Sequence, residues 1–105
     1  SGKEEMLRLL NQVPDIDAVF VNSDLMALGA IDALQSKGKR VPEDVAVIGY
    51  DDLLLAKYNN LPLTTIRQNV PLAGRLLAQN LIQFIQTGVV TNVKLPVELV
   101  VRKSA

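Results

Sequence analysis

A run of six residues, Val45–Tyr50, places the strongest limit on what this chain can fold into. It is uncharged, rich in β-branched side chains, and continuous rather than alternating. Such a run is too short for a core helix and is typical of a strand buried on both faces of a parallel sheet. Ala18–Val21 has the same character. Parallel strands need long crossover connections, which are usually helices, so helices should lie between these runs.

Helical periodicity is present between and around the two runs. The apolar spacing predicts helices over Glu4–Gln12, from Ser23 and Asp24 to about Lys37, and over Asn69–Thr87. Shorter signals predict one or two helical turns over Leu53–Tyr58, a strand over Leu63–Arg67, and a last strand over Val93–Val101. Pro96 should place that last strand at a sheet edge or in a bulge. Together these elements predict an α/β fold with a parallel, doubly wound sheet.

Composition excludes several kinds of chemistry. Apolar residues are 49% of the 105, enough for a core, and eleven basic residues balance eleven acidic ones. This segment therefore has no basic face for nucleic acid. Without His or Cys, the chain lacks disulfides, the usual zinc ligands and every His-based catalytic scheme. We expect no catalytic residue, no metal site and no cofactor.

The ends of the chain and its hydropathy bear on its location. No apolar run is long enough to span a membrane. Ser1–Glu5 is polar and charged and does not resemble a signal peptide. The chain lacks an initiator Met, so Ser1-Gly2 is interpreted as a tag remnant or as a cut inside a longer chain.

Two acidic residues, Asp51 and Asp52, directly follow the second strand. Ligands of parallel doubly wound sheets bind beyond the carboxyl ends of the strands. The pair can cap a helix or solvate a turn, or accept hydrogen bonds from ligand hydroxyls. A metal site of the kind found in phosphate-receiving signalling domains would need a further Asp and Lys, which the sequence lacks at suitable positions.

Polar residues also follow the first and third predicted strands. Ser23 and Asp24 are both good helix N-caps, yet a hydroxyl at a helix N-terminus can also contact a ligand. Gln68 ends the third strand, where it can reach a cleft or be an ordinary polar residue. Three consecutive leucines, Leu53–Leu55, cannot all enter one core. Either one faces a partner or a short helix turns two of them inward.

Four runs in order resemble the effector-binding domain of the lactose-repressor (LacI/GalR) family of bacterial transcription regulators. They are Val21–Ala30, Lys39–Asp52, Pro62–Gln68 and Leu95–Arg102. The resemblance implies a partial periplasmic-binding-protein type I fold, in which two α/β lobes enclose a ligand. Residues 1–68 would belong to the C-terminal lobe, 69–91 would be a helix and loop of the N-terminal lobe, and 92–105 would be the return strand.

The same resemblance implies roles for individual residues. Asp51 matches the acid that hydrogen-bonds the ligand. Ser23 matches a ligand-contacting position that is often Asn in sugar-binding members, so Ser departs from the pattern. Asp24 matches an acid that mainly caps its helix, and Gln68 would lie at the crossover between lobes. Contacts between two subunits are implied at five positions, namely Leu28, Asp32, Leu55, Tyr58 and Asn59.

The implied function is a cytoplasmic repressor that forms a homodimer and senses a small effector, a sugar being the family's commonest. DNA would be contacted only through a helix-turn-helix region that this chain does not include. A periplasmic sugar-binding protein of a transport system is the alternative, because it shares the two-lobed fold. An enzyme is a distant third, because the chain has no His, no Cys and no Gly-rich phosphate loop.

Overall fold

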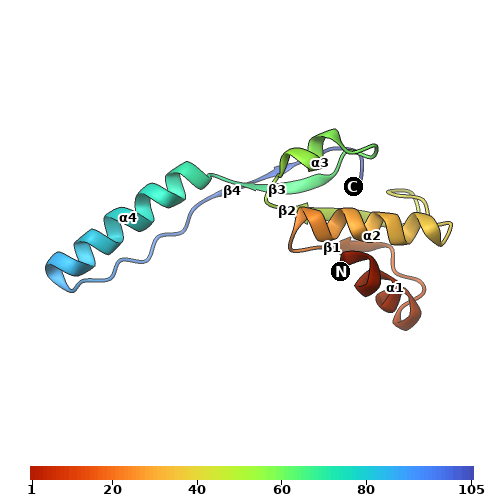
Figure 1. The fold of residues 1–105 in the computed structure, drawn as a ribbon, viewed down its shortest axis with the longest axis horizontal. Coiled ribbons are helices and arrows are strands. Elements are labelled where there is room, and N and C mark those ends of the chain that lie inside the picture. Colours follow the sequence, from red (N-terminus) through yellow and green to blue (C-terminus); the bar gives the residue numbers. More distant parts are fainter. The chain divides into compact units, whose positions relative to one another are not determined.

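Four strands form one sheet in the order β1, β2, β3, β4 (Figure 1). Their bounds are Ala18–Phe20, Ala46–Tyr50, Thr64–Gln68 and Val97–Val100, respectively. β1 pairs in parallel with β2, and β2 in parallel with β3. The prediction of an α/β fold built on a parallel sheet is therefore confirmed.

This structure is a computed structural model that describes residues 1–105, in two compact units. Unit 1 comprises Ser1–Arg67 and Leu99–Ala105, and unit 2 comprises Gln68–Glu98. The two are described separately below.

Three helices of unit 1 gather on one face of its strands. α1 is Gly2–Gln12, α2 is Asp24–Ser36 and α3 is Leu54–Tyr58. α1 packs beside α2, and α2 contacts both β2 and α3. Predicted starts and stops agree closely with these bounds: α1 ends just before Pro14, and α2 is followed by Gly38 with φ of 73°.

An aliphatic core lies between these helices and the strands. Leu34 of α2, Leu63 before β3, and Val45 and Val47 around β2 are completely buried. Because successive strand residues point to opposite faces, Val45, Val47 and Gly49 share the face toward the core. Each large side chain buried there stabilises the fold by about 1.5–3 kcal/mol.

The opposite face of the sheet is only partly covered in unit 1. Ala46, Ile48 and Tyr50 are half-buried, and Phe20 of β1 is 60% exposed, its ring edge-on to Tyr50 with centroids 6.3 Å apart. The prediction that both strands are buried on both faces is therefore wrong here. Both faces of these strands carry apolar side chains that favour burial. The helices of unit 1 cover only one of the two faces.

The C-terminal tail is fixed to unit 1 by Ser104, which is fully buried. Its hydroxyl donates to the Val47 carbonyl over 2.6 Å and accepts from the Thr64 amide over 2.8 Å. The Val47 amide donates in turn to the Ser104 carbonyl over 2.8 Å. Ser104 thus bridges the beginnings of β2 and β3, next to Pro62, which has no amide hydrogen to offer the sheet.

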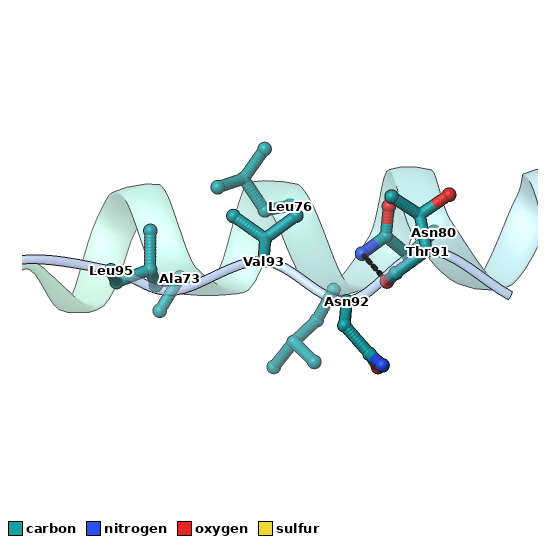
Figure 2. A pocket seen from close by; sticks show the side chains of 8 residues that line it. Ala73, Leu76, Asn80, Thr91, Asn92, Val93 and Leu95 are labelled. Atoms are coloured by element: carbon teal, nitrogen blue, oxygen red, sulfur yellow. Dashed lines mark hydrogen bonds between the residues drawn. The ribbon is translucent and has the colours of Figure 1, made fainter.

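Unit 2 consists of a helix and an extended segment, residues 88–98, which is called the return segment. α4 runs over Val70–Thr87, between the side-chain cap of Asn69 and Gly88, whose φ is 71°. The return segment runs back along α4, and the Asn80 side chain donates to the Thr91 carbonyl over 3.2 Å (Figure 2). The two leave a hollow of about 310 Å³ that is lined mainly by apolar side chains. No residue of α4 is buried.

The last strand is shorter than predicted. β4 begins at Val97, directly after Pro96, because proline has no amide hydrogen for the ladder. Its position at the end of the strand order agrees with the predicted edge. No helix in the structure combines the length and apolar character needed to cross a membrane.

Gly49→Ala should lower the free energy of unfolding by about 1–3 kcal/mol, because an added methyl group would collide with the Asp24 carboxylate and with Leu63. Urea denaturation measures the effect. Gly74→Ala on α4 is the matched control, since its added methyl group meets no atom within 4 Å. It should be neutral or stabilising by about 0.5–1 kcal/mol. Equal effects of the two changes would contradict the close packing at Gly49.

Candidate ligand-binding site

The loop that follows β2 is held through three consecutive backbone amides. The Asp51 amide donates to the Ile66 carbonyl over 2.9 Å, and the Leu53 amide donates to Asp24 Oδ2 over 2.7 Å. Between them, the Asp52 amide lies 3.4 Å from Thr65 Oγ1, a weaker contact. The loop is therefore fastened to both β3 and the start of α2.

Both aspartates have positive backbone φ angles, 105° for Asp51 and 53° for Asp52. Residues with a Cβ atom rarely adopt such angles, although Asp tolerates them better than most. Each such residue costs of the order of 1–3 kcal/mol and persists only where its surroundings hold it. The three amide contacts supply that restraint, and the combination of strain and restraint is characteristic of functional loops.

Asp24 is completely buried and does not act as a simple helix cap. One carboxylate oxygen accepts from Thr65 Oγ1 over 2.6 Å, and the other accepts from the Leu53 amide. The expected capping role is therefore wrong: Asp24 is the first residue of α2, and its side chain joins that helix to β3 and the loop. Ser23 occupies the N-cap position, but its side chain makes no capping hydrogen bond.

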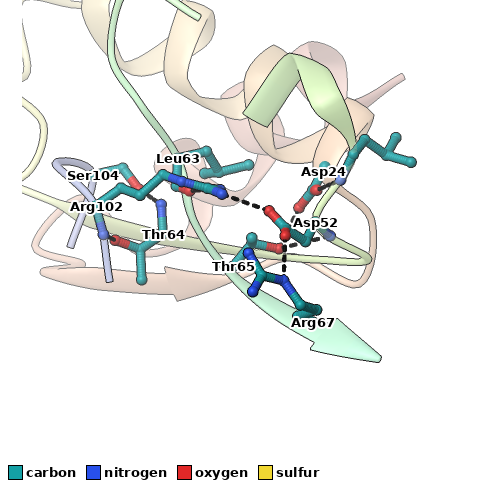
Figure 3. A network of polar contacts seen from close by, with 9 residues as sticks. Asp24, Asp52, Leu63, Thr64, Thr65, Arg67, Arg102 and Ser104 are labelled. Atoms are coloured by element: carbon teal, nitrogen blue, oxygen red, sulfur yellow. Dashed lines mark hydrogen bonds and ion pairs between the residues drawn. The ribbon is translucent and has the colours of Figure 1, made fainter. Parts of the chain in front are cut away.

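Asp52 points into a polar network that contains two arginines (Figure 3). Its Oδ1 accepts from Arg102 Nη2 and its Oδ2 from Arg67 Nε, both over 2.7 Å. Burial of the carboxyl group raises its pKa, but the hydrogen bonds from Arg67 and Arg102 outweigh this effect, and the pKa of Asp52 is lowered. Its stabilising contribution is therefore present above the unfolded pKa and is lost as pH falls through the folded pKa.

Asp51, directly after the carboxyl end of β2, is exposed. Ser23 is half-buried just beyond the carboxyl end of the neighbouring β1. Gln68 is the last residue of β3 and the first residue of unit 2, so its part in the site stays a prediction. Asp51 and Ser23 thus follow the carboxyl ends of two neighbouring strands, and a carboxylate and a hydroxyl there suit a ligand that donates hydrogen bonds.

Sequence reasoning missed the residues that hold this loop in place. Thr65, Arg67 and Arg102 lie 13, 15 and 50 residues from Asp52, so no local spacing indicates their contacts. The only available signal was weak: Thr65 and Arg67 share one face of β3 with Leu63 by strand alternation.

The residues predicted to contact a second subunit are mostly at the surface. Leu55 is 56% and Tyr58 71% exposed on α3. Asp32 is exposed and pairs with Lys3 over 2.7 Å, Leu28 is half-buried, and the Asn59 amide group donates to the Leu61 carbonyl. Leu53–Leu55 are all exposed and Ala56 is the buried residue of α3, so the alternative that the helix turns two leucines inward is wrong.

Asp51→Gly should leave the protein about 1 kcal/mol more stable than Asp51→Ala, because glycine adopts a φ near 105° without strain. Parallel urea denaturation of the two variants measures the difference. If the alanine variant were the more stable, the strained conformation of this loop would be refuted.

Comparisons with known proteins agree with this architecture. Residues 1–105 match the family described as periplasmic binding protein-like domain. The regulator CelR of Thermobifida fusca is 45% identical over 99% of this chain and 31% of its own length. The transcriptional repressor PurR of Haemophilus influenzae is 44% identical over 98% of this chain and 32% of its own length. The chain thus spans about a third of the length of these curated relatives.

Solved structures give the same result. A complex of CelR with cellobiose superposes with a TM-score of 0.87 at 44% identity, over all of this chain and 33% of that one. A lac repressor dimer bound to operator and an anti-inducer superposes with a TM-score of 0.86 at 39% identity, over 98% of this chain and 36% of that one. These relatives are regulators of transcription, which favours the repressor interpretation over a transport protein. The chain belongs to the periplasmic-binding-protein-like domain family, in the form carried by LacI-family transcription regulators.

Proposed function

We propose that this chain is the effector-sensing and dimerisation part of a cytoplasmic transcription repressor that binds a small polyhydroxylated ligand. The observation that carries the proposal is the Asp51 carboxylate, which is exposed at the carboxyl end of β2 on a loop whose backbone is strained and held. An acceptor held in this way loses little conformational entropy when a ligand binds, so its hydrogen bonds contribute more to affinity.

The chemistry of Asp51 and Ser23 favours a sugar. An ionised carboxylate only accepts hydrogen bonds, so it pairs with neighbouring hydroxyl donors of a sugar or polyol. The Ser23 hydroxyl can donate or accept beside it. The solved complex of CelR with cellobiose supports a sugar as the ligand. The repressor PurR is about equally similar in sequence to this chain, so sequence similarity alone does not select CelR as the guide.

Control of DNA binding would follow from unequal ligand affinity in two arrangements of the whole protein. A ligand shifts such an equilibrium only by its differential affinity for the two states. Residues 69–91 would belong to the second lobe, Gln68 would lie at the crossover between the lobes, and residues 92–105 would be the return strand. DNA contacts would come from a region outside this chain. The relatives are transcription regulators, so we propose a regulatory role for the chain and not an enzymatic one.

Self-association would use the surface around α3. Leu54, Leu55 and Tyr58 are large, apolar or aromatic, and 78%, 56% and 71% exposed on one five-residue helix. Exposed apolar clusters on soluble proteins usually mark contact surfaces. Leu28, Asp32 and Asn59 complete the predicted interface.

Asp51→Asn should weaken effector binding at least about tenfold in the full-length protein, because a hydrogen bond to a charged group contributes about 1.5–3 kcal/mol. Asparagine keeps the shape of the side chain and tolerates positive φ. Isothermal titration with cellobiose, other sugars and purines measures the affinity.

Operator affinity without effector should be unchanged by Asp51→Asn in a fluorescence anisotropy assay. Asp17→Asn, an exposed acid before the amino end of β1, is the control and should leave both affinities unchanged. Effector affinity that survives the change at Asp51 would sink the assignment of this residue.

Leu55→Lys should convert a dimer to a monomer in sedimentation velocity, because it places a charge in the centre of a desolvated contact. Val13→Lys, at an apolar residue that is 43% exposed just after α1, is the control and should remain dimeric. A dimer that tolerates lysine at position 55 would exclude α3 from the interface.

A further inference from the structure

We propose that Asp52 is a positioning residue that couples the ligand loop to both chain segments connecting unit 1 with unit 2. The inference rests on the proposed function of its neighbour Asp51. Asp52 itself would not contact ligand: its side chain is 11% exposed, and both oxygens are occupied within the protein.

The two arginines bound by Asp52 lie next to the two connections along the chain. Arg67 is the last residue of unit 1 before Gln68 begins unit 2, and Arg102 is three residues after Leu99, where the chain re-enters unit 1. A single carboxylate therefore holds the outgoing and the returning segment together.

The division of the two oxygens makes the coupling cooperative. Oδ1 serves Arg102 and Oδ2 serves Arg67, each over 2.7 Å, so a turn of the carboxylate that breaks one ion pair strains the other (Figure 3). Asp52 is joined to Asp51 through one peptide group, and both residues have φ angles that permit little adjustment, so a displacement of Asp52 would displace Asp51 as well. Movement of either connection is thereby transmitted to the ligand-facing acid.

Arg102 also connects Asp52 to the beginning of β3. Its side chain is 13% exposed, its Nη1 donates to the Leu63 carbonyl over 3.0 Å, and its backbone amide donates to Thr64 Oγ1 over 2.8 Å. The Asp52 carboxylate is therefore tied through Arg102 to the returning segment and to the residues that begin β3.

Hydrogen–deuterium exchange on the full-length, ligand-free protein tests the coupling. Asp52→Asn should raise exchange about tenfold in three segments together, residues 51–53, 66–68 and 100–104, as expected for loss of charge-assisted hydrogen bonds. Exchange in α2 should be unchanged. Arg67→Gln should affect 51–53 and 66–68 but spare 100–104, and it provides the test if Asp52→Asn fails to fold.

Asp44→Asn is the matched control. Asp44 also binds an arginine through both oxygens, and the hydrogen bonds from Arg40 lower its pKa to about 2, but the pair precedes β2 and lies on neither connection. Asp44→Asn should leave hydrogen–deuterium exchange unchanged in all three segments. Three results with Asp52→Asn would overturn the coupling: no rise in exchange, a rise spread evenly over unit 1, or a rise confined to residues 51–53.

Titration with cellobiose separates this inference from the proposed function. Coupling predicts that Asp52→Asn, correctly folded by circular dichroism, weakens cellobiose binding about tenfold although Asp52 touches no ligand. If Asp51→Asn bound cellobiose like the unmodified protein, or if that protein bound neither sugars nor purines, the proposed function would fail. The exchange pattern would still decide the role of Asp52.

Discussion

The buried carboxylate of Asp24 is the interaction on which the rest of unit 1 depends. It is completely enclosed, and its two oxygens accept from Thr65 and from the Leu53 amide. An ionised carboxylate without partners at that depth would cost several kcal/mol, so α2, β3 and the loop after β2 must come together around it. Gly49 follows from the same requirement, because any side chain there would displace the carboxylate. Packing and polar chemistry thus restrict this end of the sheet to one arrangement.

That arrangement explains why the neighbouring residues Asp51 and Asp52 have different surroundings. With the Leu53 amide held by Asp24 and the Asp51 amide held by Ile66, the chain turns sharply at Asp51 and Asp52, and both residues adopt positive φ. The turn directs Asp52 toward two arginines and leaves Asp51 exposed. The strained backbone therefore separates an acid that is paired within the protein from one that is exposed.

The sequence predicted features that depend on local physics, and it failed where distant contacts decide. The starts and ends of α2 and α4 follow from capping residues and glycines, and the parallel strands follow from short apolar runs. The role of Asp24 was wrong because Thr65, its partner, lies 41 residues away. Arg102 could not be found, since 50 residues separate it from Asp52 and many surface arginines have no partner. The exposure of Phe20 was missed because composition indicates which faces favour burial but not which chain segment covers them.

Exposed apolar side chains complete the physical description of each unit. In unit 2, Leu77, Ile85 and Val90 are each more than 70% exposed, although their spacing on α4 and in the return segment is that of side chains that pack. Such a surface is costly in water at about 25 cal/mol per Å² of apolar area. The relatives are about three times as long as this chain and share its fold over the matched third. The part of a relative beyond that third supplies enough protein to cover such a face. The hydrogen bonds around Asp24 and Asp52 lie within unit 1. The loop after β2 is therefore held by contacts of unit 1 itself, whereas the apolar side chains of unit 2 stay exposed within it.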